Sequence, residues 1–167
     1  FCFICLLYRS NDFSTRPCHN DFPIMIPASL HAGYRRFRDD RFLTEEARYR
    51  DLAGGQSPET MIVACADSRV DPATIFAAAP GELFVVRNVA ALVPPCETSS
   101  GYHGTSAALE FAMTGIAVKN IVVMGHGLCG GVAASLAAAE NVPTGTFLGP
   151  WVELLSGVRD DVLRDER

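Results

Sequence analysis

The sequence has no excess of basic residues. Its 14 lysines and arginines are outnumbered by 19 aspartates and glutamates, which gives a net charge of −5. A nucleic-acid-binding domain is expected to carry a clustered basic face. The one basic cluster, YRRFRDDRF at residues 34–42, is interleaved with aspartates, as is typical of a solvated helix face. We therefore expect no nucleic-acid partner.

The N-terminal stretch also lacks the marks of a membrane or secretory segment. Its apolar run, FCFICLLY, has about eight residues, whereas a helix needs roughly 20 to cross a bilayer. No basic region precedes the run and no small-residue cleavage site follows it. We predict no membrane partner and an irregular extension over residues 1–24. The C-terminal pattern stops within a helix, so we expect a single domain over residues 25–167 that is truncated at its C-terminal end.

The cysteines do not form the framework of a disulfide-rich miniprotein. The chain is long for that class, and the spacing of its six cysteines is irregular. They are Cys2, Cys5, Cys18, Cys65, Cys96 and Cys129. This usage favours a reducing, cytoplasmic setting, where cysteines more often serve metals or catalysis.

Three apolar, β-branched runs predict buried strands, at residues 60–66, 82–88 and 120–125. Helical patterns lie around them, and they cover residues 27–49, 71–80, 105–117, 130–140 and 148–163. In the second of these, Asp71 is the expected N-cap and Pro80 the expected stop. Alternating strands and helices predict an α/β fold: a parallel sheet flanked by helices, with the first pattern as an N-terminal helical arm.

Polar motifs follow two of the predicted strands: CADSR after the first and GHGLCGG after the third. The second motif contains GxGxxG, which occurs in dinucleotide-binding proteins. That interpretation requires the motif after the first strand of a βαβ unit, and an acidic residue about 20 positions on, at the end of the next strand. Here the next candidate, Glu153, lies in a helical stretch. The context therefore speaks against a dinucleotide site.

The same motifs predict a metal site. Parallel strands end at one edge of a sheet, so Cys65 should approach His126 and Cys129. Two cysteines and one histidine with an open fourth position form a catalytic zinc set. Asp67 is a possible fourth ligand, and Arg69 can pair with its carboxylate. Singly, each residue also has a structural explanation: a core cysteine, a histidine bonded to backbone, or a surface ion pair.

These residues resemble a known family. CADSRVDP (65–72) and EFAMTGIAVKNIVVMGHGLCGG (110–131) look like the two signature stretches of the β-class carbonic anhydrases, and PGELFVVRNVAALVPP (80–95) is also similar to that family. The resemblance implies one Zn²⁺ per chain, held by Cys65, His126 and Cys129. It also implies a catalytic pair of Asp67 and Arg69, in which Asp67 moves onto zinc in a closed form.

The resemblance further implies substrate-binding positions of the plant-like subtype: Gln56, Phe84, Val89, Phe111 and Gly130. Gln56 is the residue that favours this subtype, because plant-type members keep a glutamine that hydrogen-bonds substrate. The implied activity is reversible hydration of carbon dioxide to bicarbonate and a proton by zinc-bound hydroxide. The implied assembly is a homodimer or a higher homo-oligomer. In this setting the helix near residues 30–42 is expected to reach a partner subunit.

Regeneration of the hydroxide needs a route for the proton. His103, in the loop SGYHGT, is a candidate shuttle because an imidazole titrates near neutral pH; a loop histidine without a role is the alternative. Two other function classes stay open: a zinc-binding scaffold without turnover, and a redox module of Cys65 and Cys129. The redox module is disfavoured because these two cysteines do not form a CxxC pair.

Overall fold

In the computed structural model, residues 27–96 and 101–165 are described. The chain divides into two compact units between Glu45 and Glu46. The extension predicted for residues 1–24 lies outside the described residues, and the single domain predicted for residues 25–167 stays a prediction. Among the described residues, no helix combines the length and apolar character that crossing a membrane requires.

The described part of the first unit is helical. It consists of α2 (Ala28–Arg36), the π-helical segment η1 (Phe37–Arg41) and α3 (Phe42–Thr44). The two junction residues, Phe37 and Phe42, keep right-handed helical dihedral angles, so the three segments form one continuous helix. The prediction of an N-terminal helix is confirmed.

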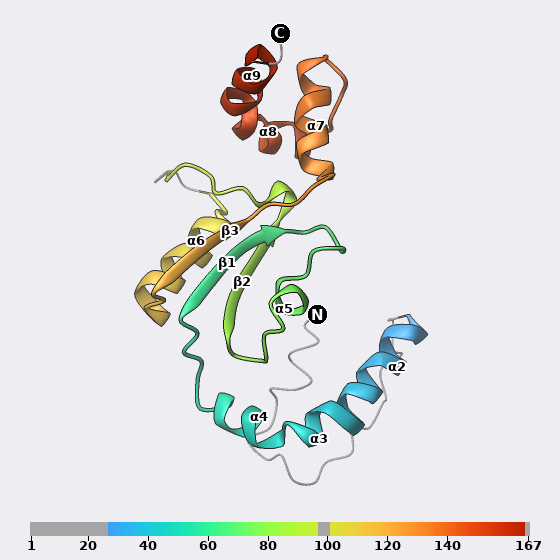
Figure 1. Ribbon diagram of the computed structural model, residues 1–167, viewed down its shortest axis with the longest axis vertical. Helices are drawn as coiled ribbons and strands as arrows, with labels where there is room; N and C mark the ends of the chain where they lie inside the picture. The colour runs from blue at the N-terminus through green and yellow to red at the C-terminus, as the bar shows by residue number, and fades with distance from the viewer. Residues whose placement is uncertain (1–26, 97–100, 166–167) are drawn as a thin grey trace. The chain divides into compact units, whose positions relative to one another are not determined.

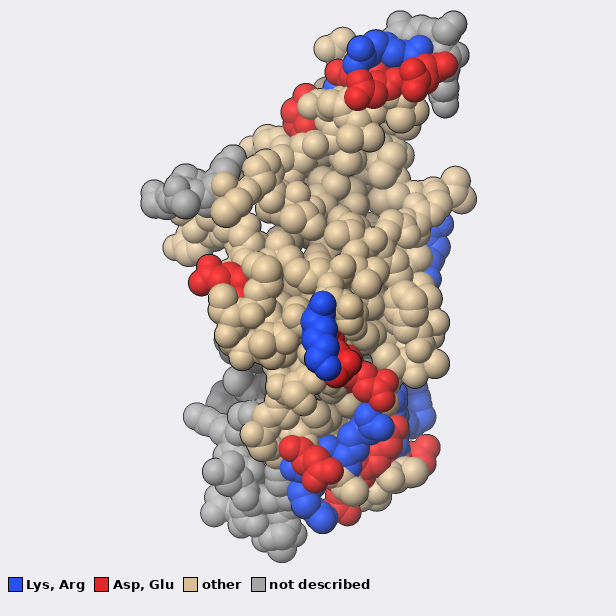
Figure 2. Space-filling view, turned by 60° about the vertical axis from the view of Figure 1, so that its left-hand side comes forward, with Lys and Arg blue, Asp and Glu red and all other residues tan. Residues whose placement is uncertain are grey.

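Charged side chains of both signs alternate along this helix. Arg38 pairs with Asp39 at 2.6 Å and Arg41 with Glu45 at 2.8 Å. On the face shown in Figure 2, basic and acidic side chains lie side by side rather than in separate patches. The helix surface is therefore a solvated one with neutralised charge, as its sequence pattern indicates.

The second unit contains a three-stranded parallel sheet (Figure 1). Its strands are β1 (Thr60–Cys65), β2 (Leu83–Asn88) and β3 (Asn120–Met124), in the order β2-β1-β3. The register places Cys65 opposite Asn88 and Ala64 opposite Met124. The carboxyl ends of all three strands thus meet at one edge of the sheet, as the sequence predicts.

Short helical segments precede, connect and follow the strands. They are α4 (Glu46–Leu52), α5 (Pro72–Ile75), η2 (Val89–Ala91), α6 (Gly104–Glu110), η3 (Phe111–Ile116), α7 (Gly130–Ala139), α8 (Leu148–Val152), η4 (Glu153–Leu155) and α9 (Ser156–Asp165). Figure 1 shows α6 beside the sheet, and α7, α8 and α9 gathered beyond the carboxyl end of β3.

The core of this unit is centred on β1, whose last five residues are buried. Met61 and Val63 pack with Ala112 of η3, and partly buried side chains of β2 and α6 surround them. A second buried cluster contains Cys65, Ala91 and Cys129. The unit therefore buries its two candidate cysteine ligands in the same way as its core, whereas His126 is partly exposed.

The structure corrects the prediction that all three strands are buried. In β3, Ile121, Val122 and Val123 are 43%, 39% and 56% exposed, and β2 is only partly buried. In the described part of the chain, each of these strands pairs with β1 alone. An apolar run is fully buried only where neighbours cover the strand, and here β1 alone has a strand on each side.

Helix α5 is also shorter than predicted. Its start is confirmed: the Asp71 side chain accepts a hydrogen bond from the Thr74 backbone N–H, and Pro72 is the first helical residue. It ends at Ile75 instead of reaching Pro80, because Ala77 adopts a left-handed conformation (φ 48°). The backbone N–H of Ala78 then donates to Ala73 O, which closes a Schellman-type C-cap.

Candidate metal centre

Three potential metal ligands converge at the carboxyl edge of the sheet. Cys65 is the last residue of β1, and His126 and Cys129 lie in the loop between β3 and α7. Their ligand atoms all lie within 4.8 Å of one another. The two sulfur atoms are 3.8 Å apart, and both thiols are free and buried. The structure thus brings together the three residues that the sequence singles out.

The orientation of His126 fits a metal ligand. Its Nδ1 lies 2.9 Å from Gly127 O, which fixes one ring nitrogen on the backbone. Its Nε2 is buried and has no hydrogen-bond partner. A buried polar atom without a partner is unfavourable unless something else satisfies it. Two thiols and one imidazole form a donor set that suits zinc, so the residues present fit this metal.

The surroundings of Cys65 favour the thiolate form of its side chain. Burial raises the pKa of its thiol, but the Asp67 backbone N–H, the nearby His126 side chain and the Ala90 backbone N–H outweigh this effect, and the pKa falls to about 7. The Asp67 nitrogen lies 3.5 Å from Cys65 Sγ. A thiolate, and not a thiol, is the form that binds a metal.

Asp67 and Arg69 form the predicted pair. Asp67 Oδ1 accepts hydrogen bonds from the Arg69 backbone N–H and from Nε, both at 2.9 Å, and Oδ2 accepts one from Nη2 at 2.7 Å. These hydrogen bonds hold the pKa of the Asp67 carboxyl far below its usual range. Arg69 Nη2 also donates to Leu128 O at 3.1 Å. The pair therefore links the loop after β1 to the loop that carries His126 and Cys129.

Arg87 at the end of β2 is a functional candidate that the sequence reasoning missed. Its Nε donates to Cys65 O at 2.8 Å and its Nη2 to Asp67 O at 2.6 Å. Its Nη1 lies 3.4 Å from Asp71 Oδ1, the oxygen of the α5 cap that faces away from Thr74. One guanidinium therefore holds the whole turn between β1 and α5. Cys65 pairs with Asn88, the residue after Arg87. A prediction of the strand register would therefore have placed Arg87 beside the candidate ligand.

The turn η2 packs against both cysteines and is unusually tight. Ala90 and Ala91 have φ angles of 68° and 54°, in the left-handed region. A Cβ atom on Gly131 of α7 would lie 2.7 Å from Val89 Cγ1 and 2.8 Å from Ala90 Cβ. Glycine at position 131 is therefore what allows α7 to approach this turn. The Trp151 indole N–H donates to Val89 O of the same turn at 2.8 Å.

The five predicted substrate-binding residues are not all at this edge of the sheet. Val89 belongs to η2, and Gly130 follows Cys129 directly. Gln56 is exposed in the segment before β1. The Phe84 and Phe111 rings pack together, with centroids 5.9 Å apart. Val89 and Gly130 are thus the two that lie next to the candidate ligands.

Phe84 pairs with Met61, whereas Cys65 pairs with Asn88. Four residues of strand span about 13 Å. The Phe84–Phe111 pair therefore lies near the amino end of β2, away from the candidate ligands of the same chain. The assignment of these rings to a substrate pocket stays a prediction.

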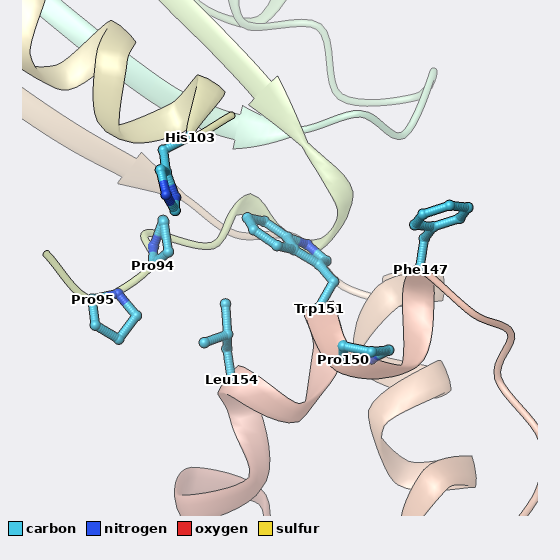
Figure 3. Close-up of a pocket in the computed structure, with 7 residues that line it drawn as sticks. All are labelled: Pro94, Pro95, His103, Phe147, Pro150, Trp151 and Leu154. Carbon is cyan, nitrogen blue, oxygen red and sulfur yellow. The ribbon is translucent and has the colours of Figure 1, made fainter. Parts of the chain in front are cut away.

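His103 lies at the start of α6 and lines a pocket of about 310 Å³. The other lining residues are Pro94, Pro95, Phe147, Pro150, Trp151 and Leu154. Figure 3 shows His103 next to Pro94, with Trp151 and Leu154 projecting from the C-terminal helices. The proton-shuttle role of His103 stays a prediction.

Comparison with protein families gives a direct match. A family model described as carbonic anhydrase matches residues 60–167. The chain is 40% identical over 116 residues to β carbonic anhydrase 5, chloroplastic, of Arabidopsis thaliana, a match that covers 70% of this chain and 38% of the relative. It is 35% identical over 138 residues to β carbonic anhydrase 3 of the same plant, covering 81% and 53%. The chain thus spans about half the length of these relatives, or less.

Solved structures agree with the sequence matches. The β-carbonic anhydrase CcaA superposes with a TM-score of 0.76 at 30% identity, covering 83% of this chain and 61% of that one. A Coccomyxa β-carbonic anhydrase in complex with acetazolamide gives 0.68 at 33% identity, covering 80% and 57%. A tetrameric β-carbonic anhydrase of Sordaria macrospora gives 0.62 at 34% identity, covering 82% and 62%.

Proposed function

The chain belongs to the β-class carbonic anhydrases, and on that premise we propose that it catalyses the reversible hydration of carbon dioxide to bicarbonate and a proton. We also propose that one zinc ion per chain is held by Cys65, His126 and Cys129. The observation that carries the proposal is the convergence of these three donor atoms within 4.8 Å, with the buried His126 Nε2 left without a protein partner.

Zinc, when bound, supplies Lewis acidity that makes a water nucleophilic near neutral pH. The protein residues then orient the reactants. The Asp67 carboxylate stays ionised because Arg69 holds its pKa low, so it accepts a hydrogen bond from the reacting oxygen and restricts the orientation of that group. Arg69 keeps Asp67 in place through two parallel hydrogen bonds. The positive charge of Arg69 also favours retention of the anionic product.

The substrate-binding proposal assigns Gln56 as a donor to a bicarbonate oxygen and Val89 and Gly130 as close neighbours of carbon dioxide. Phe84 and Phe111 form an apolar pair, and half of the Phe111 surface is exposed. Since this pair lies about 13 Å along β2 from the ligands of its own chain, we assign it to the site of another copy. A homodimer or higher homo-oligomer is therefore part of the proposal, and the tetrameric relative supports it.

The free state of both site cysteines suits a reducing compartment, and we propose the cytoplasm. For the proton, we propose His103 as the shuttle, because its imidazole lines an open pocket next to the turn after β2. Exchange of His103 for alanine should then lower turnover in weak buffer and leave it unchanged in concentrated imidazole buffer.

The test is stopped-flow carbon dioxide hydration on the full 167-residue chain, with zinc content measured on the same sample and Cys65→Ala as control. We expect zinc and turnover in the wild type, and neither in the variant. Zinc without turnover would favour a zinc-binding scaffold. A folded chain that takes up no zinc would contradict the proposed metal site.

A further inference from the structure

The turn η2 is connected to the C-terminal helices by one side chain. Trp151 of α8 donates its indole N–H to Val89 O at 2.8 Å. Figure 3 shows the indole directed from α8 toward the chain that follows β2. The sequence contains a single tryptophan, and the proposed function assigns it no role.

The acceptor of this bond belongs to a peptide group that faces the candidate ligands. The carbonyl of Val89 and the N–H of Ala90 are the two ends of one peptide bond. Ala90 and Ala91 pack against Cys65 and Cys129, and the Ala90 backbone N–H helps to lower the pKa of the Cys65 thiol. A hydrogen bond to a peptide oxygen polarises the group and strengthens its N–H as a donor.

The orientation of this peptide group is not a relaxed one. Two successive alanines with positive φ are unfavourable, and such backbone persists only where its surroundings hold it. The backbone of α7 packs closely against this peptide group at Gly131, where a Cβ atom would lie 3.1 Å from Ala90 N. The indole of Trp151 holds the carbonyl of the same group. Without the indole N–H, the Val89 carbonyl loses this hydrogen bond, and the orientation of the peptide group beside Cys65 is less tightly fixed.

We propose that Trp151 is a positioning residue for the metal ligand Cys65, which it acts on through the Val89–Ala90 peptide group. Trp151 contacts neither zinc nor substrate in this scheme. Its indole N–H fixes the direction of the Val89–Ala90 peptide group, whose Ala90 end packs against Cys65. This inference rests on the proposed function, since it concerns the same metal site. Groups that orient ligands from outside typically change metal affinity by about 10–100-fold.

The experiment compares three forms of the full chain with wild type. Trp151→Phe removes the N–H together with part of the ring. Incorporation of 3-benzothienylalanine, possible because the chain has one tryptophan, keeps the fused ring and replaces N–H by sulfur. Phe147→Leu is the matched control, because Phe147 is an exposed aromatic residue of the same pocket. The probes are Co²⁺ alone and Zn²⁺ alone, with chelator competition for affinity and the thiolate-to-Co²⁺ charge-transfer band for ligand geometry.

We expect both N–H-deficient forms to bind metal about tenfold more weakly than wild type and to shift the charge-transfer band, while Phe147→Leu matches wild type. In the metal-free wild type, the single indole N–H should exchange slowly in ¹H–¹⁵N spectra. If the benzothienyl form binds as tightly as wild type with an unchanged band, or if the indole N–H exchanges freely, the Trp151 inference is wrong and the proposed function stands. If wild type binds neither metal, both fail.

Discussion

The two loops that carry the candidate ligands are held in different ways. The loop after β1 receives hydrogen bonds from Arg87 at the carbonyls of Cys65 and Asp67, and it ends in the capped first turn of α5. In the loop after β3, Leu128 has a φ of 54° and is 90% exposed. A side chain of the first loop, Arg69, bonds to the carbonyl of this residue.

This difference indicates that the site is assembled asymmetrically. The first loop is part of the sheet edge, because Arg87 of β2 holds it through part-buried hydrogen bonds and it leads directly into the capped helix α5. The second loop takes its position partly from the first, through Arg69. Arg69 therefore has two tasks: it fixes the Asp67 carboxylate, and it connects the two loops.

Arg69→Gln tests the asymmetry between the two loops most directly. We expect turnover to fall roughly 10²-fold, because Asp67 and the second loop lose their alignment, while zinc stays bound. Hydrogen exchange should become faster at residues 126–129 and stay unchanged at residues 65–67, as measured by mass spectrometry. Arg164→Gln, which removes an exposed ion pair with Asp161 on α9, is the control. Equal acceleration in both loops would contradict the asymmetry.

Arg87→Met should have the opposite regional effect. It leaves the carbonyls of Cys65 and Asp67 without their donor, and we expect a loss of about 1–3 kcal/mol in the free energy of unfolding, measured in urea. Exchange should become faster at residues 65–71 before it does so at residues 126–129. Arg87→Lys should recover part of the stability, since an ammonium cannot span both carbonyls as a guanidinium does. Full recovery by lysine would refute the bidentate role.

Gly131→Ala tests how closely α7 approaches the turn η2. The new Cβ would lie within 3 Å of two side-chain atoms and 3.1 Å from a backbone nitrogen, so we expect a loss of about 1–3 kcal/mol in thermal or urea unfolding. Gly130→Ala is the matched control for stability, because a Cβ there meets no atom within 4 Å. If both variants lost a similar amount of unfolding free energy, the turn η2 would accommodate the new Cβ without strain, and the close approach of α7 would not matter for stability.

Asp71→Ala should have the smallest effect, about 1 kcal/mol, as is usual for loss of an N-cap. The Thr74 hydroxyl and backbone N–H lower the pKa of Asp71 in the folded chain. Its charge therefore contributes stability above the unfolded pKa of about 3.9, and this contribution is lost as the pH falls through the lower folded pKa.

Asp71→Asn separates the cap from the charge, since asparagine caps equally well. The stability difference between wild type and Asp71→Asn should shrink below about pH 4 in urea titrations at several pH values. A difference that grows toward acid would mean that the carboxylate is unfavourable in the fold.

The sequence predicts the strands and the meeting of Cys65, His126 and Cys129, because apolar runs and the geometry of parallel strands depend on local pattern alone. It also predicts the Asp71 cap, which is a contact over three residues. It predicts the burial of β3 wrongly, since an apolar run does not reveal whether a neighbouring strand is present.

The sequence does not predict the roles of three other residues, Arg87, Gly131 and Trp151, for a different reason. Each acts across space on a segment far from it along the chain: Trp151 is 62 residues from Val89, and Arg87 is 22 residues from Cys65. Their residue types have ordinary structural roles in most proteins. Only the register of the sheet and the packing of α7 and α8 show that all three converge on the turns around the candidate metal ligands.

The bond from Trp151 to Val89 O also gives the protein a built-in optical probe. Because the sequence has one tryptophan, its fluorescence comes from a single place, the contact between α8 and the turn that packs on Cys65. Indole emission depends on hydrogen bonding and on nearby water, so its wavelength reports the state of this contact. Local opening of the turn and the proposed metal uptake can therefore be followed in solution without any attached dye.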